Sequence, residues 1–156
     1  MASPGAPATQ VYQVFIKTTP HRLWQAITTP DFTTRYFHGA AITADARRLV
    51  SIGPDGSTWM DEEVYDYDPP RRLSHRWRSL YDPASAGEEP SRVTWEIEPQ
   101  PGGICKLTVV HDCLEGAPVT AAHVGGPGWM FVLSALKTLL ETGQPLAQPA
   151  SASPPA

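Results

Sequence analysis

Two histidines that alternate with apolar residues are the side chains best suited to chemistry in this sequence. His75 lies between Leu73 and Trp77, two positions from each, and His111 follows Val109 by two positions. Residues two apart in a strand face the same side, so we expect both imidazoles on an apolar, inward surface. An imidazole with a pKa of about 6.5 could act there as a general acid or base, or could orient a ligand carbonyl. The alternative is a buried neutral histidine bonded to a backbone carbonyl or a water.

Acidic residues lie on both faces of the segment Thr58–Tyr67. One alternating set contains Asp61 and Glu63, and the other contains Glu62 and Asp66. The alternation therefore does not decide which face of this segment lines an interior cavity. If the set with Glu63 faced inward, its carboxylate could pair with a cavity histidine; otherwise it points to solvent.

Aromatic residues occupy many of the apolar positions of the expected strands and helices. The tryptophans at such positions are Trp24, Trp77, Trp95 and Trp129. They could form an aromatic box around a flat ligand, or they could be ordinary core residues. The candidate ligand-binding residues are Trp77, His75, Trp95, His111, Val109, Trp129 and Leu133. The candidate catalytic residues are His75 and His111.

The sequence predicts neither a metal site nor a bound cofactor. His111, Asp112 and Cys113 carry atoms that could bind a metal, but neighbouring residues of a strand point to opposite faces. The sequence contains no CxxC pair, nucleophile elbow, phosphate-binding loop or dinucleotide glycine motif. Cys105 and Cys113 would lie roughly 26 Å apart in one extended strand, too far for a disulfide.

Length and charge restrict the possible partners. The chain has 156 residues, about one domain's worth, with 41% hydrophobic residues and a net charge of −4. This charge argues against nucleic-acid binding, which needs a basic surface. No apolar run reaches the roughly 18 residues of a membrane span. The start MASPGAPATQ does not resemble a signal peptide, so we expect a cytoplasmic protein.

Proline and glycine residues divide the chain into segments. Residues 1–9 and 144–156 are rich in Pro, Ala and Ser, and we expect them to be flexible tails around a domain at 10–143. Thr19-Pro20 and Thr29-Pro30 are helix start signals, which predict two consecutive short helices. After the 125–128 breaker, apolar residues at helical spacing predict a long helix over Trp129–Leu140, stopped by Gly143.

Between these helices the apolar period changes to two, which predicts strands. The expected strands, including one before the first helix, are Val11–Thr18, Leu49–Ile52, Thr58–Tyr67, Leu73–Arg78, Arg92–Glu98 and Cys105–Asp112, with a loop over 81–90. Repeated one-sided alternation indicates an antiparallel sheet with one covered face. The predicted class is α+β, in the order β-α-α, then five or six antiparallel strands, then a long helix packed on the sheet.

This pattern resembles the START-like (SRPBCC) helix-grip superfamily, in a bacterial branch similar to the heat-shock protein 90 ATPase activator homologue domain. Three segments carry the resemblance: Thr19–Pro30, the stretch Glu63–Leu73 that leads to Trp77, and Gly128-Trp129 with Leu133, Leu136 and Leu140. It covers about residues 10–142. The chain has Tyr36 where the family often has Trp, and Glu62 where it often has a small residue.

The resemblance implies a cavity between the curved sheet and the C-terminal helix. It favours binding of a small apolar or aromatic molecule there, without a cofactor. The alternative is an enzyme of cyclase, dehydratase or hydrolase type that uses His75 or His111 as proton carrier. A third class is an interaction module that binds a chaperone or associates with itself.

Overall fold

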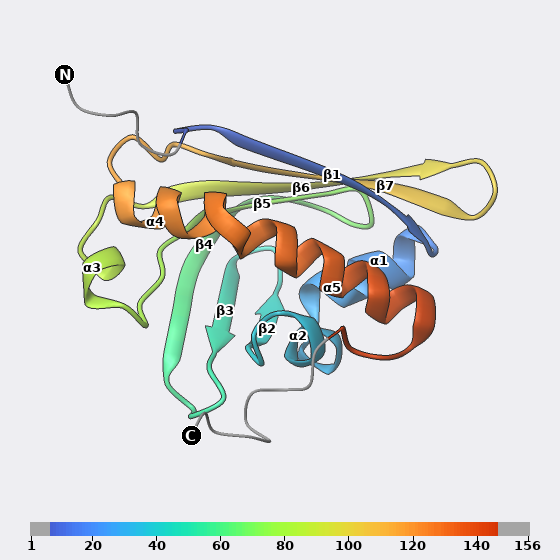
Figure 1. Ribbon diagram of the computed structural model, residues 1–156, viewed down its shortest axis with the longest axis horizontal. Coiled ribbons are helices and arrows are strands. Elements are labelled where there is room, and N and C mark those ends of the chain that lie inside the picture. The colour runs from blue at the N-terminus through green and yellow to red at the C-terminus, as the bar shows by residue number, and fades with distance from the viewer. Residues whose placement is uncertain (1–6, 147–156) are drawn as a thin grey trace.

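Seven antiparallel strands form one curled sheet, and helices cover its inner face (Figure 1). The computed structural model of the protein describes residues 7–146. The strands are β1 (Gln10–Lys17), β2 (Ala41–Ala44), β3 (Arg48–Ile52), β4 (Thr58–Asp68), β5 (Arg72–Trp77), β6 (Ser91–Gln100) and β7 (Ile104–Asp112). The helical elements are α1 (Pro20–Thr28), α2 (Pro30–Tyr36), α3 (Pro83–Ala86), α4 (Pro118–His123), the π-helical turn η1 (Val124–Gly128) and α5 (Trp129–Thr142).

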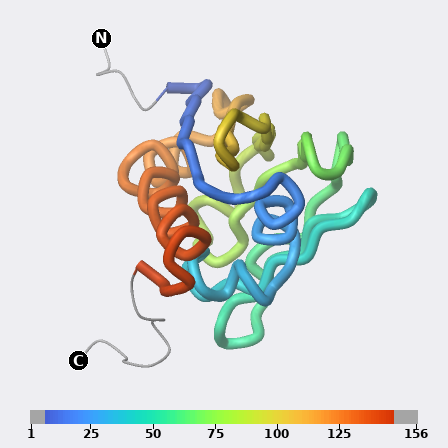
Figure 2. The backbone as a smooth tube through the Cα atoms, turned by 90° about the vertical axis from the view of Figure 1, so that its right-hand side faces the viewer, coloured from blue at the N-terminus to red at the C-terminus, as the bar shows by residue number. Residues whose placement is uncertain are grey.

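The sheet order β1-β7-β6-β5-β4-β3-β2 is a meander from β2 to β7, with β1 added beside β7. The α4–α5 run crosses the front of the sheet, and α1 and α2 close one end, which faces the viewer in Figure 2. The predicted α+β helix-grip fold is confirmed. Six strands follow the first two helices, at the top of the expected range, and β2 is the one that the sequence did not delimit.

The local signals explain where the main helices begin and end. The Thr19 side chain accepts a hydrogen bond from the backbone N–H of Arg22, and Pro20 occupies the first turn of α1. At the other end of the chain, Gly143 adopts the left-handed conformation with φ 77° and donates to the Leu139 carbonyl. The short helices α3 and α4 were not predicted, and α3 lies inside the segment expected to be a loop.

The two faces of the sheet have opposite character. Fully buried apolar residues from the inner face and from the helices form the main core, among them Ile16, Leu23, Leu73, Leu107, Leu136 and Leu139. Charged pairs bridge neighbouring strands elsewhere on the sheet: Arg48–Asp61, Arg72–Glu96, Arg92–Asp112 and Lys106–Glu98. The covered face is therefore apolar, as the alternation predicted.

Strand β4 settles the question that its sequence left open. Met60, Glu62 and Val64 are buried, whereas Asp61 and Glu63 are exposed. The carboxylates of Asp61 and Glu63 therefore point to solvent. The buried carboxylate is that of Glu62, which accepts from Arg76 Nε at 2.9 Å.

A β-bulge explains why simple alternation fails along the rest of β4. The register shifts between Val64 and Asp66, so that Tyr67 pairs with Leu73, an inner-face residue. The ring of Tyr67 then packs edge-on against Trp24, with centroids 5.4 Å apart. One extra residue in a strand reverses the facing of everything beyond it.

The elements α4, η1 and α5 form one helical run, Pro118–Thr142, of 25 residues. By length and composition alone this run could cross a membrane. In the fold, however, Trp129, Leu136 and Leu139 of α5 are buried against the sheet, as in the core helix of a globular domain. This packing accounts for its apolar character.

The expected tails, 1–9 and 144–156, lie largely outside the described residues. Of the part that is described, Ala8 packs against a small cluster of Leu114, Ala117 and Ala121. The carbonyl of Ala8 also accepts from the Leu114 backbone N–H at 3.2 Å.

Candidate functional site: an aromatic cleft at one end of the sheet

His111 is held by a tryptophan from the covering helix. Its Nδ1 accepts a hydrogen bond from Trp129 Nε1 at 3.0 Å, and its Nε2 lies 2.7 Å from Ser91 Oγ. An indole nitrogen can only donate, so the proton of the neutral imidazole sits on Nε2. The His111 Nε2–H therefore donates to the Ser91 hydroxyl.

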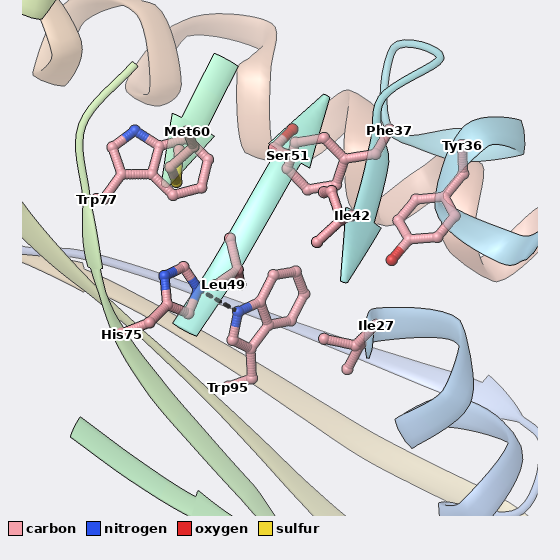
Figure 3. A pocket seen from close by; sticks show the side chains of 10 residues that line it. All are labelled: Ile27, Tyr36, Phe37, Ile42, Leu49, Ser51, Met60, His75, Trp77 and Trp95. Carbon is pink, nitrogen blue, oxygen red and sulfur yellow. Dashed lines mark hydrogen bonds between the residues drawn. The ribbon is translucent and has the colours of Figure 1, made fainter. Parts of the chain in front are cut away.

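His75 forms the same kind of pair within the sheet. Its Nε2 accepts from Trp95 Nε1 at 3.1 Å, and its Nδ1 donates to the Arg76 carbonyl at 3.0 Å (Figure 3). The two histidines thus carry their protons on opposite ring nitrogens. In both, each ring nitrogen already has a partner.

Burial keeps both imidazoles neutral. Removal from water lowers the pKa of His75 to about 4, and removal from water together with the nearby His75 lowers the pKa of His111 to about 3. Neither ring therefore carries a charge near neutral pH, and neither has a free lone pair or a free N–H. This is the geometry of structural histidines, and it gives no support to proton transfer by either one. Glu63 is exposed, so it does not pair with them.

The candidate ligand-binding residues separate into two groups. Val109, His111 and Leu133 are buried in the packed core and border neither of the two spaces described below. Trp77, His75, Trp95 and Trp129 border two spaces that lie nearer one end of the sheet. The middle of the interface between sheet and α5, where the sequence placed the cavity, is therefore filled by side chains.

The larger space is an open cleft of about 730 Å³, here called the outer cleft. It lies between the end of α2, strands β3 to β5 with the loop that follows, and the α4–η1–α5 run. Its floor is formed by Phe37, Trp77 and Trp129. Its polar lining residues include Ser51, Ser79, His38 and His123.

Aromatic side chains form the rim of the outer cleft on two sides. On the sheet side, Trp59 packs against Tyr81 with ring centroids 5.4 Å apart. On the helix side, His38 stacks on Phe131 at 6.0 Å with an interplanar angle of 15°. Tyr81 is 57% exposed and Phe131 is 40% exposed, so both offer apolar surface to an incoming molecule.

Backbone conformation places two of these rim residues. A Cβ on Gly53 would lie 2.3 Å from the Trp59 ring, so the indole can lie there only because residue 53 is glycine. His38 has a positive φ of 55°, which turns the chain at the end of α2. Burial also lowers the pKa of His38.

A second space, the inner void, lies behind the outer cleft (Figure 3). Its volume is about 20 Å³, roughly that needed for a single water molecule. Phe37, Ser51, Met60 and Trp77 border both spaces. These four residues therefore form the wall between the outer cleft and the inner void.

Trp77 differs from the other two indoles near the site. Its Nε1 is buried and has no hydrogen-bond partner among residues 7–146, and in Figure 3 it points away from His75. Because a buried N–H without a partner is costly, this atom is the polar group of the wall that would gain most from a hydrogen-bond acceptor. Among the described residues, no three histidine, cysteine or acidic side chains gather closely enough to hold a metal ion.

Comparison with known proteins agrees with this architecture. The sequence model of the family described as "Activator of Hsp90 ATPase homolog 1-like protein" matches residues 17–141. The chain belongs to this family. No curated protein matches the sequence.

Solved structures show the same fold. Protein MLL2253 from Mesorhizobium loti is 26% identical, with a TM-score of 0.68 over 85% of this chain and 96% of that one. DynU16, a putative protein in the dynemicin biosynthetic locus, is 24% identical with a TM-score of 0.70, over 89% of this chain and 49% of that one. The Aha1 dimer from Colwellia psychrerythraea is 18% identical with a TM-score of 0.67, over 86% and 97%.

Sequence reasoning missed most of the rim. Tyr81 lay in an expected loop, and His38 follows the second helix without any pattern. Phe131 did carry a signal: with Met130 it is a large apolar residue outside the buried stripe of α5, and both are exposed. Large apolar residues on the outer side of an otherwise amphipathic helix are a sign of a binding surface.

Proposed function

We propose that the protein binds a small, flat, apolar or aromatic molecule in the outer cleft. The observation that carries this proposal is the size and lining of that space. Its volume of about 730 Å³ falls within the range of roughly 300–1,000 Å³ typical of small-molecule sites. Its walls are mainly aromatic and apolar, with a few hydroxyl and imidazole groups that could orient a ligand.

The packing of the rest of the interface supports the same location. Val109 and Leu136 are fully buried, and Leu133 is nearly so. A ligand placed between the middle of the sheet and α5 would have to displace this core. At the outer cleft, by contrast, Trp59, Tyr81 and Phe131 already present partly exposed rings.

The family agrees with this proposal at a general level. Membership of the activator-homologue family fits either binding of an apolar ligand or association with a chaperone. A structural relative from a biosynthetic locus is compatible with small-molecule binding. Among the described residues, the outer cleft is the feature that favours binding of an apolar ligand over association with a chaperone.

A fluorescent apolar probe can test the proposal. We expect 1-aminoanthracene to bind the protein saturably, at one site. Ala122 is exposed and borders the outer cleft, so Ala122→Trp should fill part of the cleft and weaken probe binding by about tenfold or more. Ala84→Trp is the matched control, since Ala84 is exposed on α3 away from the cleft.

The control variant should bind the probe like the unmodified protein. Equal binding by the unmodified protein and Ala122→Trp would place the probe elsewhere. Absence of saturable binding to the unmodified protein would remove the proposal.

A further inference from the structure

We propose that the molecule bound in the outer cleft is a flat aromatic ketone or quinone, whose carbonyl oxygen accepts a hydrogen bond from Trp77 Nε1. This inference rests on the proposed function and specifies the ligand's polar group. It starts from the difference between three neighbouring indoles.

Two of the three indole N–H groups have partners inside the protein. Trp95 donates to His75, and Trp129 donates to His111. The Nε1 of Trp77, although buried, donates to no described atom. The residue as a whole is 9% exposed.

Neither neighbouring histidine can serve as the acceptor for Trp77. The imidazoles packed around its ring are His75, with centroids 6.2 Å apart, and His111, at 5.3 Å. Their acceptor nitrogens are already used by Trp95 and Trp129. Neither histidine can therefore turn to Trp77 without leaving another buried indole N–H unpaired.

Trp77 lies in the lining of the outer cleft, where a ligand would meet it. The residue belongs to the wall that separates the outer cleft from the inner void. The rings of Phe37 and Trp129 lie 6.4 Å and 5.6 Å from it. A flat molecule bound in the outer cleft would pack against this cluster of rings, next to the Trp77 indole.

The charge of the lining decides which kind of acceptor fits. None of the described residues that line the outer cleft is Lys or Arg, and none is Asp or Glu. A carboxylate or phosphate would lose its hydration there without meeting a positive charge. A neutral carbonyl oxygen needs only the single donor that Trp77 supplies, so an aromatic ketone or quinone fits best.

A matched pair of probes can test this assignment. Fluorene and 9-fluorenone have the same three-ring skeleton, and only the second carries a carbonyl oxygen. For each protein we compare the dissociation constants of fluorene and 9-fluorenone. The ratio of fluorene to 9-fluorenone should be about tenfold larger in the unmodified protein than in Trp77→Phe, which corresponds to one buried hydrogen bond. Tyr65→Phe is the control and should keep the preference, because Tyr65 is exposed on β4 and borders neither space.

Nuclear magnetic resonance gives a second readout that does not depend on a variant's stability. The Trp77 indole N–H signal, identified by its absence in Trp77→Phe or by backbone assignment, should move downfield with 9-fluorenone and not with fluorene. If the variant does not fold, this shift and the preference of the unmodified protein still decide the question.

The outcomes separate the two proposals. If neither compound binds, the proposed function fails. If both bind the cleft with the same affinity, and the Trp77 signal responds alike to both, the cleft is a binding site but the assignment of a carbonyl acceptor is overturned. The latter result would indicate that a water molecule already satisfies the indole.

Discussion

At the scale of single residues, the same histidine–tryptophan hydrogen-bond arrangement occurs twice. A buried imidazole accepts an indole N–H on one nitrogen and donates from the other, at His75 with Trp95 and at His111 with Trp129. The sequence indicated that both histidines face inward, and it offered a buried neutral histidine as one interpretation. It could not show the partners, because Trp95 and Trp129 come from a separate strand and a separate helix and meet the histidines only through sheet register and helix docking.

Identical substitutions at three tryptophans should therefore have different effects. Trp129→Phe and Trp95→Phe leave a buried imidazole nitrogen unpaired, whereas Trp77→Phe removes an N–H that has no partner. All three substitutions replace an indole by the smaller phenyl ring, so the loss of packing is common to them. We expect the first two to lose about 1–3 kcal/mol more unfolding free energy than Trp77→Phe, measured by urea denaturation. Equal losses at all three positions would contradict the pairing described above.

The two histidines should also make stability depend on pH. Their pKa values are about 4 and about 3 in the folded protein, below the ordinary value near 6.5, so the unfolded chain binds protons more readily. The contribution of the two neutral histidines to the free energy of unfolding is complete above about pH 6.5 and is lost as the pH falls towards 4. Each should reduce the unfolding free energy by about 1.4 kcal/mol per pH unit within that window.

Urea unfolding at pH 7, 6 and 5 checks this dependence. His111→Gln should remove about half of the slope of unfolding free energy against pH. His21 is exposed, so His21→Gln is the control and should leave this slope unchanged. A stability that is the same at pH 5 and pH 7 in the unmodified protein would show that these rings are not buried as neutral groups.

At the scale of elements, helix α5 protects the edge strand β1. The Phe15 carbonyl accepts from Lys137 Nζ at 2.7 Å, and the Lys17 N–H donates to Glu141 Oε2 at 2.9 Å. Lys137 and Glu141 also pair with each other at 2.8 Å. The backbone groups at the end of β1 are thus occupied, which reduces pairing with another chain.

Removal of the carboxylate should expose this edge. In Glu141→Ala, the Lys17 amide loses its acceptor, so we expect its hydrogen exchange to accelerate severalfold, with a stability loss of about 0.5–1.5 kcal/mol. Glu115 is an exposed acid outside α5 and β1, so Glu115→Ala is the control. Unchanged exchange at Lys17 would mean that the contact with Glu141 does not persist in solution.

The junction between η1 and α5 depends on a glycine for a steric reason. A Cβ on Gly128 would lie 2.7 Å from the His123 carbonyl oxygen, a backbone atom that cannot move aside easily. Gly128→Ala should therefore cost about 1–3 kcal/mol and lower the midpoint of thermal unfolding. Gly87→Ala, where the nearest atom is 3.8 Å away, should change stability by less than about 0.5 kcal/mol. Similar effects of the two substitutions would show that the helical run bends freely at this point.

Elements were easier to predict than their details. Pro20 and Gly143 mark helix ends through local chemistry, and one-sided alternation identifies most strands. Alternation did not predict which side chains of β4 point to the inner face, because the bulge after Val64 depends on how β4 pairs with β5. The short β2 has too few residues for its period to be clear.

At the scale of the whole molecule, the binding space lies at one end of the sheet. The family resemblance implied a cavity beneath the C-terminal helix, and Trp77 and Trp129 do border the outer cleft. Val109 and Leu133 do not, because side chains fill the middle of that interface. Cleft position depends on how α2, β4 and α5 curve around each other, which no local pattern records.

The most direct test of this account is to map where 9-fluorenone binds, by chemical-shift changes in the isotope-labelled protein. We predict that the changes concentrate on Phe37, Trp59, Tyr81 and Phe131 around the outer cleft, and that Val109 and Leu133 are nearly unaffected. Changes centred on Val109 and Leu133, with little effect at Tyr81 and Phe131, would contradict it and place the ligand beneath the middle of α5.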